Sequence, residues 1–330
     1  MAPPVEVGLI LALTLRGLFI EDFGKMKEIA REAERLGFGS LWHCDHFISL
    51  DPNAYGAQSG FGSQAGGEGP PSRPMLEAWT ALTALAGATK TIRLGTLVSC
   101  VHYRPPALLA KIAASLDAVS GGRVELGLGA GWVGTEYAAF GYPFPKASVR
   151  IAMLEEAIQL IRAMWSQPNP AYEGGYYQIA GAVCDPKPLQ KPMPPIFTGG
   201  EGAKLLGVAA RQADGYNCRW WPPERFLERR PILEAECKKA GRDPEKLRAS
   251  LMVMVIPEKD RAKARAAREK LKVVPETGAI YGPPEECVKR LAAYVKAGVR
   301  HLLLTVPDLE EHPERLGLLG AEVLPALKGM

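Results

Sequence analysis

Apolar stretches suited to β-strands alternate with segments of helical periodicity along the whole chain. The apolar stretches cover residues 5–15, 39–47, 92–100, 123–131, 196–200, 214–220, 247–256 and 299–306. Apolar positions spaced three or four residues apart predict helices over 21–37, 74–89, 105–122, 148–165, 203–212, 223–240, 258–272 and 284–297, with a last helix towards the C-terminus. A regular alternation of strands and helices predicts a parallel sheet.

Two α/β architectures fit this alternation. A doubly wound sheet of this length usually divides into two domains joined by a linker, and no such linker is visible. The two longest polar stretches, 51–73 and 166–195, follow strand ends, as loop insertions do. We therefore predict one (β/α)8 TIM barrel over residues 1–330, with an active site at the C-terminal ends of its strands. We expect 51–73 to be a lid or binding loop, and 166–195 to contain a hairpin.

Charge and cysteine usage exclude several classes of function. The 40 Lys and Arg residues are mixed with 36 Asp and Glu residues, giving a net charge of +4. This pattern indicates a solvated surface and not a nucleic-acid-binding stripe. No apolar run is long enough to span a membrane, and the six cysteines show no C-x-x-C spacing. We expect reduced thiols and a cytoplasmic protein.

The glycine-rich stretch "VELGLGAGW" (124–132) ends the fourth predicted strand. A dinucleotide-binding turn requires G-x-G-x-x-G opening a helix, whereas this spacing is G-x-G-x-G and no helix follows at once. One interpretation is that Gly127, Gly129 and Gly131 let the strand end approach a flat ligand. The alternative is that small residues here relieve crowding in the barrel core.

Polar residues at other strand ends are candidates for chemistry. The second strand ends with His43, Asp45 and His46, and histidine suits proton transfer near neutral pH. No further His and carboxylate cluster completes a metal site, so we expect no metal. A glycine-rich turn at Gly199, Gly200 and Gly202 precedes a predicted helix, and it is either a phosphate-binding turn or an ordinary βα turn.

Several stretches occur together in an order typical of one protein family. They include "EAERLGFGSLWHCDHF", "RLGTLVSCVHYRPPALLAKIAASLDAVSGGRVELGLGAGW", "EYAAFGYPFP", "YEGGYYQ", "PKPLQKPMPPIFTGG" and "ARQADGYN", within residues 5–220. The sequence resembles the luciferase-like monooxygenase superfamily, and within it the branch of coenzyme F420-dependent oxidoreductases. The combination is specific, although no single stretch is.

The resemblance implies a barrel that holds the deazaflavin ring of the cofactor against a bulge in the third strand. In this family the bulge often contains a non-proline cis peptide, which here falls at Leu97–Val98. The residues that match the family's cofactor contacts are Asp45, Leu97, Val98, Cys100, Gly131, Thr135, Gly199, Gly200 and Gly202. Those that match its substrate pocket are His46, Trp132, Asn217, Arg219 and Trp220.

The resemblance also implies the reaction, a hydride transfer between coenzyme F420 and a small organic substrate. His46 would donate or accept a proton, and Asp45 would position His46 or the ring. Trp132 stands where the family's sugar-phosphate dehydrogenases carry an acidic residue, and Leu50 replaces a ring-packing tryptophan. We therefore do not expect sugar-phosphate oxidation.

Two alternatives remain open within the resemblance. The first is an FMN-dependent monooxygenase that uses O2 together with a separate flavin reductase. The second is a non-catalytic flavin-binding relative. Barrels of this family often pair through outer helices, so we expect a homodimer, with no nucleic-acid or membrane partner.

Overall fold

The computed structural model describes residues 4–13, 18, 20–48, 75–271 and 276–330. Parallel pairing runs from β12 through β1, β2, β3, β5, β8, β9 and β10, and β10 pairs with β12 to close the ring. These strands span Glu6–Ala12 (β1), Ser40–His43 (β2), Arg93–Thr96 (β3), Val124–Gly129 (β5), Ile196–Gly199 (β8), Gly215–Arg219 (β9), Arg248–Pro257 (β10) and His301–Thr305 (β12). The predicted (β/α)8 barrel is confirmed.

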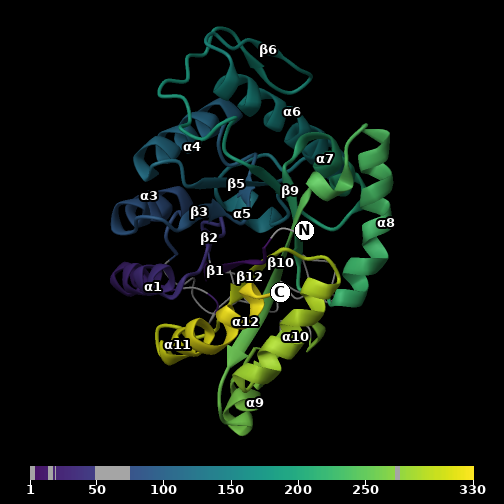
Figure 1. The fold of residues 1–330 in the computed structure, drawn as a ribbon. Helices are drawn as coiled ribbons and strands as arrows, with labels where there is room; N and C mark the ends of the chain where they lie inside the picture. Colours follow the sequence, from purple (N-terminus) through teal and green to yellow (C-terminus); the bar gives the residue numbers. More distant parts are fainter. Residues whose placement is uncertain (1–3, 14–17, 19, 49–74, 272–275) are drawn as a thin grey trace.

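Helices lie around the outside of the strands (Figure 1). The first begins where the Asp22 carboxylate accepts a 2.8 Å hydrogen bond from the Lys25 amide, and it ends at Gly37, whose φ of 86° suits glycine. The main helices span Phe23–Leu36 (α1), Ala78–Ala88 (α3), Pro106–Ser120 (α4), Ala147–Ser166 (α6), Ala203–Gln212 (α7), Pro223–Lys239 (α8), Arg261–Glu269 (α9) and Pro284–Lys296 (α10).

The third predicted strand is divided in two. β3 ends at Thr96, the Leu97–Val98 peptide bond is cis, and Ser99–Cys100 (β4) continues along β5. The cis bond expected from the family resemblance is therefore present in the structure. The second strand is shorter than predicted and ends at His43.

Other differences concern the chain's later segments. The hairpin expected within 166–195 is present as Tyr172–Glu173 (β6) and Gln178–Ile179 (β7). The last predicted helix is interrupted by a π-helical turn, Leu319–Val323, between Glu314–Leu318 (α11) and Leu324–Lys328 (α12). Sequence patterns missed the short elements Gly134–Ala139 (α5) and Ala279–Gly282 (β11). The predicted loop 51–73 and Leu50 lie outside the described residues.

Large side chains fill the barrel interior below the strand ends. Trp42, Phe197 and His301 form a triangle with ring centroids 5.7 to 6.2 Å apart. His301 Nε2 lies 3.1 Å from the Ser40 hydroxyl, and burial lowers the pKa of His301 to about 3, so this ring is neutral. Because these rings pack inside the described barrel, we expect a ligand to bind at the C-terminal end of its strands.

Candidate active site

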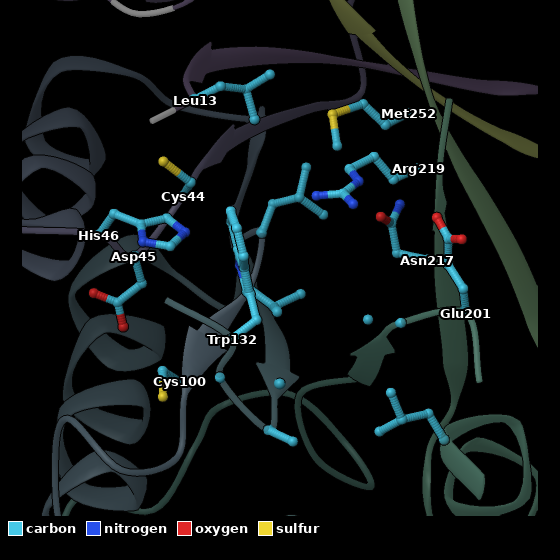
Figure 2. A pocket seen from close by; sticks show the side chains of 18 of the residues that line it. Leu13, Cys44, Asp45, His46, Cys100, Trp132, Glu201, Asn217, Arg219 and Met252 are labelled. Carbon is cyan, nitrogen blue, oxygen red and sulfur yellow. The ribbon is translucent and has the colours of Figure 1, made fainter. Parts of the chain in front are cut away.

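A cavity of about 380 Å³ opens at the C-terminal ends of the strands. Its size falls in the range of small-molecule and cofactor sites. Figure 2 shows Asp45, His46 and Cys100 on one side, Asn217 and Arg219 on the other, and Trp132 between them. The described lining residues are Leu13, Cys44, Asp45, His46, Leu97, Val98, Cys100, Tyr103, Gly129, Ala130, Gly131, Trp132, Gly199, Gly200, Glu201, Leu205, Asn217, Arg219, Trp220 and Met252.

Val98, directly after the cis peptide bond, lines the cavity, and we refer to it as the floor of the cavity. A Cβ atom on Gly129 would lie 2.6 Å from Val98 Cγ2, and one on Gly199 would lie 3.2 Å from Cγ1. A Cβ atom on Gly127 would overlap the carbonyl oxygen of Thr96. Gly127 thus makes room for the neighbouring strand, which is the packing alternative. Gly129 fits both interpretations of the glycine-rich stretch, since it makes room for Val98 and also lines the cavity. Gly199 likewise makes room for Val98 and lines the cavity.

Asp45 is engaged by a cation that sequence reasoning did not identify. Its carboxylate is 1% exposed and accepts hydrogen bonds of 2.6 and 3.0 Å from both terminal nitrogens of Arg104. Arg104 also pairs with Glu77. A buried carboxylate needs such a partner, and the two-pronged geometry fixes its orientation. The expectation that Asp45 positions His46 or the cofactor ring stays a prediction.

His46 is positioned by Glu136, on α5. His46 Nδ1 lies 2.7 Å from Glu136 Oε2, and the tyrosine hydroxyl of Tyr103 donates a 2.6 Å hydrogen bond to the same oxygen. Glu136 Oε1 accepts hydrogen bonds from the backbone amides of Phe47 and Ile48. With Nδ1 engaged, Nε2 is the nitrogen that remains for a ligand, and the ring points towards the cavity centre (Figure 2).

The electrostatics of Glu136 favour its charged form. Burial alone would raise its pKa, but the hydrogen bond from His46, the charge of His46 and the hydrogen bond from Tyr103 outweigh burial, and the pKa is lowered. Its side chain has no exposed surface. The predicted site omitted Glu136, although "TEYAAF" follows the glycine-rich strand end within a few residues.

Cys100 forms part of the wall next to this pair. Its Sγ lies 2.9 Å from the Tyr137 hydroxyl, whose oxygen also lies 2.9 Å from His102 Nδ1. Burial raises the pKa of the Cys100 thiol to about 11, so the thiol stays protonated at neutral pH. Cys100 therefore shapes the cavity and is not a thiolate nucleophile.

The opposite side of the cavity is built on β9. Asn217 and Arg219 share the inner face of this strand because they are two residues apart. Asn217 Nδ2 donates a 2.9 Å hydrogen bond to the Ser250 hydroxyl on β10. The Arg219 guanidinium lies 5.8 Å from the ring centroid of Trp132 and 5.6 Å from that of Trp220.

The structure brings together most of the residues that the sequence singled out, but not all. Gly199 and Gly200 line the cavity, whereas Gly202 caps the N-terminus of α7 and does not line it. Thr135 lies in α5 and is also absent from the lining. Within the described part of the chain, no group of three or more His, Cys, Asp and Glu side chains is arranged to hold a metal ion. None of the described helices is long and apolar enough to cross a bilayer.

Known proteins resemble this chain in sequence and in fold. Residues 12–274 match the sequence profile of the luciferase-like monooxygenase family. The chain belongs to this family. A relative from Microbacterium testaceum, named F420-dependent glucose-6-phosphate dehydrogenase, is 31% identical over 93% of this chain and 92% of its own length.

Two solved structures share the fold of this chain. An F420-dependent secondary alcohol dehydrogenase, solved with an F420-acetone adduct, has a TM-score of 0.79 at 22% identity, covering 98% of this chain and 99% of that one. A monooxygenase from Streptomyces bottropensis has a TM-score of 0.76 at 20% identity, covering 97% of this chain and 99% of that one. At these identities the likeness concerns the barrel itself.

Proposed function

We propose that this member of the luciferase-like monooxygenase family is an F420-dependent oxidoreductase that transfers a hydride to or from a small organic substrate. The observation that carries the proposal is the His46–Glu136 pair of 2.7 Å at the edge of the cavity. Hydride transfer to a carbonyl carbon requires a proton at the oxygen, and a neutral-pH acid–base group must stand within reach. Bound coenzyme F420 supplies the hydride donor or acceptor at C5 of its ring.

The cavity residues suit a flat ring. Val98 offers an apolar floor between Gly129 and Gly199, where side chains would otherwise collide. Leu97 and Cys100 continue the wall, and Gly131 and Gly200 leave their backbones open to the cavity. Asp45, fixed by Arg104, would accept a hydrogen bond from the ring edge. The N-terminus of α7, close to Gly200, suits a phosphate group.

His46 would hold the proton at Nε2 and exchange it with the substrate oxygen. Glu136 is a positioning residue for His46, because it engages Nδ1 and orients the ring. A buried carboxylate on one imidazole nitrogen fixes the tautomer and stabilises the protonated ring. Trp132, whose ring centroid lies 5.8 Å from that of His46, would close the substrate side of the cavity.

The choice of coenzyme F420 over FMN rests on the relatives. The chain is 31% identical to a protein named for F420 dependence, whereas the monooxygenase likeness is at 20% identity and concerns the fold. We do not infer glucose 6-phosphate as the substrate of this chain from the name of that relative. Trp132 occupies the position where an acidic residue is expected for that reaction, and an indole cannot exchange a proton there.

Turnover separates hydride transfer from oxygenation. We expect the protein to oxidise reduced coenzyme F420 anaerobically when unsaturated ketones are added, or to reduce the oxidised coenzyme with alcohols. The measurement is the absorbance of the coenzyme under nitrogen, with Gly87→Ala as a control variant remote from the cavity. Activity that appears only with O2 and reduced FMN would contradict the proposal, and so would binding of the coenzyme without turnover of any compound.

A further inference from the structure

A hydrogen-bonded chain of four side chains runs from the cavity wall to α6. Cys100 is its one member among the described residues that line the cavity. The Cys100 sulfur lies 2.9 Å from the Tyr137 hydroxyl oxygen, and this oxygen lies 2.9 Å from His102 Nδ1. On the other side of the imidazole, His102 Nε2 lies 3.2 Å from the sulfur of Met153, a residue of α6.

The far end of this chain fixes the direction of its hydrogen bonds. A thioether sulfur can accept a hydrogen bond but not donate one, so His102 carries its proton on Nε2 and donates it to Met153. Burial and the nearby charge of Arg150 lower the pKa of His102 to about 4, so the ring is neutral near pH 7. Nδ1 of a neutral ring protonated at Nε2 can only accept, and the Tyr137 hydroxyl donates to it.

The near end of the chain follows from the same rule. Because the hydrogen of the Tyr137 hydroxyl is used on His102, its oxygen accepts and the Cys100 thiol donates. The thiol has a hydrogen to donate, since burial raises the pKa of Cys100 to about 11. With this hydrogen directed at Tyr137, the Cys100 sulfur presents lone pairs and no donor to the cavity.

The packing of Gly131 places the Tyr137 hydroxyl directly behind the cavity wall. A Cβ atom on Gly131 would overlap this hydroxyl and would lie 2.8 Å from the Cys100 sulfur. Gly131 has a φ of 74°, which favours glycine, and its carbonyl oxygen accepts a 3.3 Å hydrogen bond from Arg150. Tyr137 is fully buried and is not among the described lining residues, so it acts on a ligand only through Cys100.

We propose that Tyr137, His102 and Met153 are positioning residues that hold the Cys100 sulfur as a hydrogen-bond acceptor, and that this sulfur accepts from an N–H group of the bound cofactor ring. A ring edge that offers only acceptors to Cys100 is disfavoured, so the chain selects which edge of the ring faces this wall. The inference rests on the proposed function, because the ring in question is that of coenzyme F420.

Infrared spectroscopy of the S–H stretch tests the direction of the thiol without any cofactor. The band that disappears in Cys100→Ala belongs to Cys100, which separates it from the bands of the other cysteines. A thiol that donates a hydrogen bond absorbs at lower wavenumber than a free thiol, so Tyr137→Phe should shift the band upwards. Met153→Leu should shift it in the same direction, because His102 loses the acceptor that fixes its tautomer, and this variant covers the case that Tyr137→Phe does not fold.

Tyr142→Phe is the matched control for Tyr137→Phe. Tyr142 packs against the same aromatic cluster, and its hydroxyl donates a 3.1 Å hydrogen bond to the Tyr103 carbonyl oxygen instead of contacting Cys100. Removal of this hydroxyl should leave the Cys100 band where it is in the unaltered protein.

Coenzyme titrations test the contact with the ring. Cys100→Ala should weaken F420 binding about threefold to tenfold, the range of a single hydrogen bond. Cys100→Ser keeps both a donor for Tyr137 and an acceptor for the ring, so its Kd should stay within about twofold. Tyr137→Phe lets the thiol hydrogen turn towards the ring and should weaken binding by a similar factor. The double variant Tyr137→Phe/Cys100→Ala should bind no more weakly than Cys100→Ala, because both changes act on one contact.

Several results would overturn the inference. They are a Cys100 band at the wavenumber of a free thiol in the unaltered protein, a band that moves as far in Tyr142→Phe as in Tyr137→Phe, unchanged F420 affinity in Cys100→Ala, and additive losses in the double variant. If the unaltered protein binds no F420, the proposed function fails and the ring contact fails with it. The infrared bands of the cofactor-free protein still confirm or overturn the positioning of the thiol in that case.

Discussion

Replacing His46 with glutamine is expected to lower kcat by about 100-fold to 10,000-fold, the range that a positioned acid–base group contributes. Glutamine keeps a polar side chain of similar length but cannot exchange a proton. Because His46 reaches the cavity through Nε2 and is not part of the Val98 floor, the Kd for coenzyme F420 should change by less than about threefold, which is below 1 kcal/mol. Steady-state turnover and a coenzyme titration on the same preparation measure both quantities.

Glu136→Gln tests the other half of the pair. This variant keeps the hydrogen-bonding length but removes the charge that stabilises a protonated imidazole, so the pH profile of kcat/KM should move to lower pH. A purely structural role would lower the amount of folded protein without moving the profile. Tyr103→Phe is the matched control, because it removes a hydrogen bond to the same oxygen and leaves the charge. Unchanged turnover in His46→Gln would exclude the acid–base role.

Gly127→Ala is expected to lower the free energy of unfolding by about 3 kcal/mol, at the upper end of what overpacking costs. The added methyl group would overlap the Thr96 carbonyl oxygen, and neither backbone segment can move without separating β3 from β5. Thr96 also donates a 3.0 Å hydrogen bond to the Gly127 carbonyl, which such a separation would break.

Denaturant unfolding provides the measurement for Gly127→Ala. The matched control is Gly87→Ala, in α3, where a Cβ atom meets nothing within 4 Å. That change should stabilise the protein by about 0.5 to 1 kcal/mol, because alanine is the better helix former. Equal stabilities of the two variants would contradict the close approach of β3 and β5 at Gly127.

The barrel was predictable because its signal is periodic and repeated. Buried apolar strands alternate with amphipathic helices along the chain, and each unit supports the same interpretation. The break in the third strand was not predictable from periodicity, since nothing in the order of polar and apolar residues in "GTLVSC" marks an interruption. The family resemblance predicted this break, as a bulge with a cis peptide bond at Leu97–Val98.

The site was predictable where its residues follow strand ends. Asp45, His46, Asn217 and Arg219 lie directly at or after β2 and β9, and all line the cavity. Pairings across the cavity were not predictable, because Arg104 meets Asp45 and Glu136 meets His46 only after β4 and α5 are placed.

The arginine that pairs with Asp45 could have been anticipated by a physical argument. A carboxylate as buried as Asp45 requires a cation, and "VHYRPP" supplies an arginine at the end of the adjacent strand. The same argument does not find Glu136, since nothing in the sequence indicates that α5 turns back over the cavity. Thr135 and Gly202 were transferred from the family pattern, and they are not among the residues that line the described cavity.

The most direct test of the account is a side-by-side equilibrium titration of the purified protein with coenzyme F420 and with FMN, followed by fluorescence. We expect micromolar or tighter binding of F420, a binding free energy of about 8 kcal/mol, and much weaker binding of FMN. Val98→Gly, which removes the floor of the cavity, should weaken the F420 complex. Preferential binding of FMN, or binding of neither compound, would contradict the assignment of a deazaflavin site.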